Sequence, residues 1–77
     1  METLLHYLNS LSPLEQAAYA ARCGTTVGYL RKAISKRQRF DGALARLLDE
    51  QSGGVVKRAL LRPDIWPELA EQEAPSA

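Results

Sequence analysis

A glycine at position 24 separates two short helical patterns with almost no chain between them. The first pattern, residues 13–22, is rich in alanine, and the second begins one or two residues after the glycine, capped by Thr26 or Thr25. Gly24 can adopt the left-handed conformation that often ends a helix, and a small residue such as Ala20 allows two helices to cross closely. This stretch therefore predicts two helices that meet at a steep angle around a tight turn.

Apolar spacing and cap residues predict an all-α fold of five short helices. Ser12 and Glu15 form a capping box around Pro13, and Asp41 is a cap candidate for a later helix. We find no strand pattern, since "GGVV" lacks the alternation that a strand needs around it. The predicted helices are residues 2–9, 13–22, 27 to 35 or 36, 41–51 and 56–61.

The chain has 77 residues, which is enough for one domain. We expect residues 1–69 to form that domain and residues 70–77 to form a disordered acidic tail. Cys23 is the only cysteine, so no internal disulfide is possible and a reducing cytoplasmic setting fits best. We interpret it as a small, partly buried apolar side chain rather than as a reactive thiol. No apolar run approaches the roughly 20 residues that span a bilayer, so we expect no membrane contact.

Positive charge is concentrated in one segment. Residues 22–39 contain six basic side chains and no acid, whereas the rest of the chain has four basic residues against nine acidic ones, for a net charge of +1. Such a distribution suits a surface that binds a polyanion, although a solvated basic surface without a partner has the same composition. Apolar residues within the segment build a helix, and the basic ones are left to contact the polyanion.

The two crossing helices match a helix-turn-helix that places its second helix in the DNA major groove. With Leu30, Ala33 and Ile34 directed inward, Arg31, Lys32 and Ser35 would face the base edges. Polar residues at the helix starts and basic residues after the second helix would contact phosphates. The expected DNA-binding residues are Gln16, Thr25, Thr26, Val27, Gly28, Tyr29, Arg31, Lys32, Ser35, Lys36, Arg37 and Arg39.

The stretch "QAAYAARCGTTVGYLRKAISKRQRF" resembles the helix-turn-helix of Cro-like bacteriophage repressors, whose fold is that of lambda repressor. The stretch "GGVVKRALLRPDIWPEL" is similar to the C-terminal signature of the YdaS-like branch of that superfamily. The resemblance implies a sequence-specific regulator of phage or prophage genes that binds operator DNA as a homodimer in the bacterial cytoplasm, at the nucleoid. For some members it implies an antitoxin role. Gly28 and Tyr29 depart from the polar residues common in the family. Tyr29 either contacts DNA or packs against the next helix.

Other classes of function have weaker support. The chain lacks a phosphate-binding loop, a nucleophile–base pair and clustered carboxylates, and so short a chain is not expected to form a concave pocket. We therefore predict no enzyme, small-molecule substrate, cofactor or metal site. A protein-binding antitoxin or phage-encoded inhibitor is the alternative, with Ile65, Trp66 and Leu69 as its contact segment. In that case Trp66 lies in an interface, whereas otherwise it caps the core. Arg62 and Asp64 are expected to pair or to bond nearby backbone.

Overall fold

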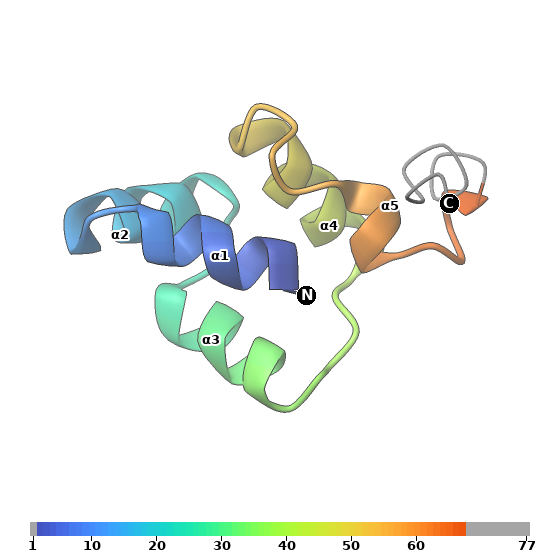
Figure 1. The fold of residues 1–77 in the computed structure, drawn as a ribbon, viewed down its shortest axis with the longest axis horizontal. Coiled ribbons are helices and arrows are strands. Elements are labelled where there is room, and N and C mark those ends of the chain that lie inside the picture. The colour runs from blue at the N-terminus through green and yellow to red at the C-terminus, as the bar shows by residue number, and fades with distance from the viewer. Residues whose placement is uncertain (1, 68–77) are drawn as a thin grey trace.

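The computed structural model describes residues 2–67, and over that range the chain is all-helical. In Figure 1, α1 crosses the middle of the molecule between α2 on one side and α4 and α5 on the other, with α3 along the lower edge. The prediction of an all-α fold with five helices is confirmed. The prediction for residues 70–77 falls outside the described residues. The helices are α1 (Glu2–Ser10), α2 (Pro13–Arg22), α3 (Val27–Ser35), α4 (Gly42–Gln51) and α5 (Arg58–Leu61).

The turn between α2 and α3 has the hydrogen bonds of a Schellman motif. Gly24 has φ +75°, and its N–H donates to the Ala21 carbonyl at 3.0 Å. The Thr25 N–H donates to the Ala20 carbonyl at 2.9 Å. These bonds satisfy carbonyls that the end of a helix leaves without partners. Ala20 is only 1% exposed, so this small residue is buried, as a close approach of another helix at that position requires.

Side-chain caps define where the helices begin. Ser12 and Glu15 form the predicted capping box. The Ser12 N–H donates to Glu15 Oε1 at 2.9 Å, and the Glu15 N–H donates to Ser12 Oγ at 3.2 Å. Thr26, rather than Thr25, caps α3 by accepting from the Tyr29 N–H at 3.1 Å. Asp41 occupies the N-cap position of α4 but makes no capping bond with its side chain. The predicted N-cap position of Asp41 is therefore confirmed, although its carboxylate makes no capping bond, and the helix itself begins at Gly42.

The core lies where the four longer helices meet. Leu4 and Leu8 of α1 are fully buried together with Tyr19, whose ring packs edge-on against Tyr7 with centroids 5.0 Å apart. Cys23 is 3% exposed, which is more buried than predicted, and this burial raises the pKa of its thiol. The buried cluster also contains Ala20, Leu30, Ala33, Phe40, Ala45, Leu48, Val56 and Leu61.

The last helix is shorter than predicted, and the segment before it is bonded by side chains of α4 and its C-cap residue. The Val56 N–H donates to Ser52 Oγ, and the Arg58 N–H donates to Asp49 Oδ2, both at 2.9 Å. These N–H groups would have no partner within α5, because the first N–H groups of a helix lack one, so the two side chains satisfy them. The helix itself starts at Arg58 rather than at Val56. None of the described helices is long and apolar enough to span a membrane.

The Arg62 side chain connects the end of α5 to the segment before α4 by hydrogen bonding. Its Nε and Nη2 bond the two oxygens of Asp64 at 2.9 and 2.8 Å, and its Nη1 donates to the Phe40 carbonyl at 2.8 Å. The Arg62 guanidinium lowers the pKa of Asp64 to about 2. The predicted pairing of Arg62 with Asp64 is confirmed, whereas the backbone bond of Arg62 goes to the distant Phe40 rather than to backbone near the turn. Trp66 packs against the core, so it does cap the core. The centroid of its ring lies 5.6 Å from Cζ of the Arg58 guanidinium.

Candidate nucleic-acid interface

One side of α3 is buried and the other faces solvent. Leu30 and Ala33 are buried and Ile34 is half-buried, as the apolar spacing predicted. Lys32 and Ser35 are exposed on the other side of the helix. The helix therefore rests on the core and presents polar side chains outward, which is the arrangement that a groove-binding helix needs.

Arg31 is half-buried, since its side chain reaches back toward the two preceding helices. Its Nη2 donates to Asn9 Oδ1 at the end of α1 and to Gln16 Oε1 in α2, both at 3.2 Å. Gln16 is also half-buried, and its Nε2 donates to the Leu11 carbonyl at 3.0 Å. The structure thus brings together Gln16 and Arg31, two of the residues selected from the sequence, and adds Asn9 to them.

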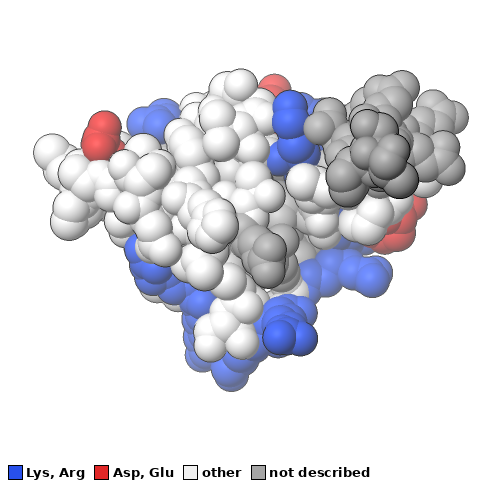
Figure 2. Space-filling view, viewed as in Figure 1, with Lys and Arg blue, Asp and Glu red and all other residues white. Residues whose placement is uncertain are grey.

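The basic residues after α3 line the loop to α4. Lys36, Arg37 and Arg39 are exposed, and Arg37 has a left-handed backbone with φ +54°. Figure 2 shows Lys and Arg side chains gathered along the lower edge of the molecule, over α3 and this loop. The Arg39 guanidinium lies 3.7 Å from Asp64, with 69% of its side chain exposed. Since an ion pair this exposed is weak, Arg39 retains most of its availability to a polyanion.

The first residues of α3 and the turn before it vary in exposure. Thr26 and Gly28 are exposed, whereas Thr25 is half-buried in the turn. Val27 is partly buried and packs against the core, so it supports the helix. Tyr29 is 48% exposed and does not belong to the core cluster. A large aromatic side chain at the start of an exposed helix is available for contact with a partner.

Sequence reasoning missed Asn9. The residue lies in the last turn of α1, within the predicted helix of residues 2–9, and no sequence pattern marked it as a site residue. No local pattern links it to Arg31, which is 22 positions away. Arg22, the first basic residue of the charged segment, donates from Nε to Gln51 Oε1 at 3.2 Å. It is therefore held at the end of α4 rather than among the side chains of α3.

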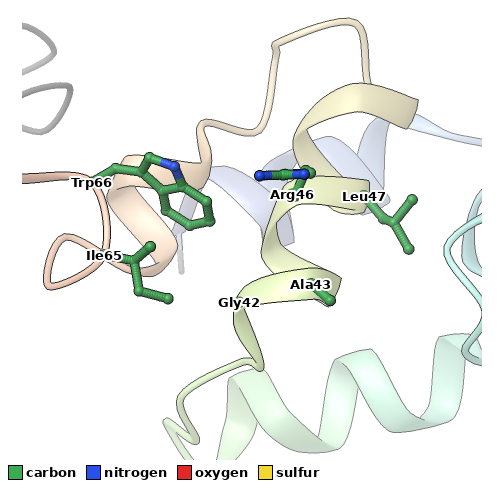
Figure 3. A pocket seen from close by; sticks show the side chains of 6 residues that line it. All are labelled: Gly42, Ala43, Arg46, Leu47, Ile65 and Trp66. Atoms are coloured by element: carbon green, nitrogen blue, oxygen red, sulfur yellow. The ribbon is translucent and has the colours of Figure 1, made fainter.

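An open groove lies between α4 and the segment after α5, which the short chain was not expected to form. Its volume is about 480 Å³. Ile65 and Trp66 face α4 across it (Figure 3). A Cβ on Gly42 would lie 2.8 Å from Ile65 Cδ1, so the glycine allows this close approach. Among the residues that the structure describes, Arg46 is the only charged side chain lining the groove, and these residues offer no nucleophile or acid–base pair there.

Comparison with known proteins gives one informative similarity. The chain is 34% identical to a prophage transcriptional regulatory protein of Escherichia coli strain K12, over 61 residues that make up 79% of this chain and 92% of that protein. No protein-family model matches the chain. No solved structure matches it either.

Proposed function

Because the chain belongs to the family of this prophage transcriptional regulatory protein, we propose that it is a sequence-specific DNA-binding regulator of the Cro type. Helices α2 and α3 act as a helix-turn-helix, and α3 enters the major groove of operator DNA. The regulator works as a homodimer in the cytoplasm of a bacterial host. The observation that carries the proposal is the exposed basic surface formed by α3 and the loop that follows it.

The residues divide into two roles by their place on this surface. Arg31, Lys32 and Ser35 contact base edges, and Tyr29 contacts a sugar or a thymine methyl group from the start of the helix. The phosphate contacts come from the helix starts and from the loop after α3. They are made by Gln16, by Thr25 and Thr26, and by Lys36, Arg37 and Arg39. Gly28 lies with the residues that face the major groove, and Val27 supports α3 against the core.

Dimerisation provides more DNA contacts than one small domain can make. Two copies double the number of DNA contacts, and the spacing of their α3 helices sets an operator with two-fold symmetry. Ile65 is 43% exposed and Leu60 is 44% exposed, so apolar surface for such a contact is present near the C-terminal segment. We expect the sedimentation coefficient to rise to that of a dimer on operator DNA.

Selection from a pool of random duplex DNA at about 150 mM salt tests the proposal. Enrichment of a palindrome with half-sites roughly 10 base pairs apart supports a dimeric operator-binding regulator. Failure to enrich any sequence, with only weak salt-sensitive binding, contradicts it.

Variants then test the assignment of residues. Arg31→Ala should lose about 1–3 kcal/mol of binding free energy and relax base preference at one position. Arg39→Ala should weaken binding to all sequences alike. Arg46→Ala is the matched control, because it removes the same charge from an exposed residue on α4, beside the groove. Unchanged operator affinity in Arg31→Ala would show that the groove assignment is wrong.

A protein-binding role, as an antitoxin or a phage-encoded inhibitor, is the second candidate. The groove beside Ile65 and Trp66 is the observation that favours it. Such binding would be insensitive to salt and would be lost in Trp66→Ala, whereas DNA affinity falls steeply as salt rises.

A further inference from the structure

The Arg31 side chain connects three helices through one nitrogen atom. Its Nη2 donates to two acceptors, Asn9 Oδ1 in α1 and Gln16 Oε1 in α2. The orientation of the Gln16 amide is fixed, because its Nε2 donates to the Leu11 carbonyl at 3.0 Å. Its oxygen therefore faces the guanidinium.

The two partners hold the guanidinium without neutralising it. Both acceptors are neutral amide oxygens, and among the described residues no carboxylate lies within 4.0 Å of Arg31. The positive charge therefore remains available to a polyanion. A carboxylate in place of either amide would form an ion pair and reduce that availability.

The shared nitrogen limits what Arg31 can bind in this conformation. A bidentate contact to guanine uses two parallel N–H groups, and each of the two parallel pairs of a guanidinium includes one hydrogen of the nitrogen distal to the side-chain stem. In this chain that nitrogen is Nη2, which already donates to two acceptors. A bidentate contact to guanine therefore competes with the two amides for the hydrogens of Nη2, and the release of one amide makes such a contact possible.

Burial and bonding identify the amide that is released. Asn9 is exposed, and among the described residues its amide makes no second side-chain hydrogen bond. Gln16 is half-buried and anchored to Leu11, so it loses more if it moves. We propose that Asn9 is a positioning residue of the DNA-binding surface, which holds Arg31 in the free protein and releases it when Arg31 binds guanine. This inference rests on the proposed DNA binding.

Removal of the Asn9 amide then favours the bound state. The free protein loses a hydrogen bond that the complex has already given up, so Asn9→Ala should bind its operator about two- to tenfold more tightly. In an Arg31→Ala background the same change should have no effect. The double-mutant cycle therefore isolates the action of Asn9 through Arg31.

Ser10→Ala is the matched control. Ser10 is the next residue of α1, and its Oγ donates to the Tyr7 carbonyl at 2.6 Å rather than to Arg31. It should leave operator affinity unchanged. Gln16→Ala should weaken binding, because Gln16 keeps its bond to Arg31 in the complex.

Two measurements decide between outcomes. Operator affinity is measured by fluorescence anisotropy for the parent, the single variants and Asn9→Ala/Arg31→Ala. The exchange rate of the Arg31 guanidinium hydrogens, measured by NMR in the free protein, should rise in Asn9→Ala. Weaker operator binding by Asn9→Ala, or an equal effect of Asn9→Ala on affinity with and without Arg31, would overturn this inference but not the proposed function. Absence of specific binding by the parent would overturn the proposed function as well.

Discussion

Arg37 adopts a backbone conformation that suits glycine better than arginine. It follows Lys36, the C-cap of α3, with φ +54°. The Gln38 N–H donates to the Ala33 carbonyl at 2.9 Å, and the Arg37 N–H donates to the Ile34 carbonyl at 3.1 Å. These are the bonds of a Schellman motif, in which the residue at this position is usually glycine.

Arg37→Gly should therefore stabilise the protein. The left-handed conformation costs a residue with a Cβ roughly 1–2 kcal/mol. Glycine removes that cost but adds about 0.5–1 kcal/mol of backbone entropy in the unfolded chain. The difference is a gain of about 0.5–1 kcal/mol, which raises the Tm of a domain of this size by about 2–8 °C.

The same substitution should weaken DNA binding, since it removes a proposed phosphate contact. Thermal unfolding followed by circular dichroism gives the Tm, and titrations at several salt concentrations give the affinity. Loss of one phosphate contact from each protomer should reduce the slope of log affinity against log salt by about 0.9 per protomer, or about 1.8 for the proposed dimer.

Arg37→Ala separates the two effects. It removes the same charge but keeps a Cβ, so it should reduce DNA affinity equally without raising the Tm. Gly24→Ala provides the reverse case, because it places a Cβ at φ +75° and should lower the Tm. Equal Tm values for Arg37→Gly and Arg37→Ala would refute the backbone argument. Unchanged DNA affinity in both would refute the phosphate contact while leaving that argument intact.

Three further outcomes follow from the packing and the charges. Gly24→Val should lower the Tm strongly, because a β-branched residue is strained at φ +75°, and an unchanged Tm would contradict the turn. Tyr19→Phe should cost about 1 kcal/mol of unfolding free energy by chemical denaturation, since the Tyr19 hydroxyl donates to the Leu48 carbonyl at 2.7 Å. Asp64 has a pKa lowered to about 2, so its contribution to stability is complete above its unfolded pKa of about 4 and is lost as the pH falls toward 2. The Tm difference between the parent and Asp64→Asn should disappear over that interval, and a constant difference would count against the Arg62 pairing.

Local signals predicted much of the fold. The capping box of Ser12 and Glu15 and the glycine turn at Gly24 involve residues close in sequence, so their hydrogen bonds depend little on the rest of the chain. The start of α5 could not be predicted in this way. Val56 has an apolar side chain that is fully buried, but it lies before the helix, where its N–H donates to Ser52 Oγ.

In the candidate site too, some features follow from residues close in sequence and others depend on distant segments. Exposure of Lys32 and Ser35 follows from the period of α3, because the apolar residues that it buries fix the opposite side of the helix. The position of the Arg31 side chain depends on Asn9 and Gln16, which come from two other helices.

The sequence by itself determined the helices, the turn between α2 and α3, and the concentration of positive charge, since each depends on neighbouring residues. Only the tertiary structure decided which partners Arg31 has, where α5 begins, and that a groove lies beside Trp66. These features arise where segments distant along the chain meet. Their hydrogen bonds and contacts exist only once the core has fixed the helices in place.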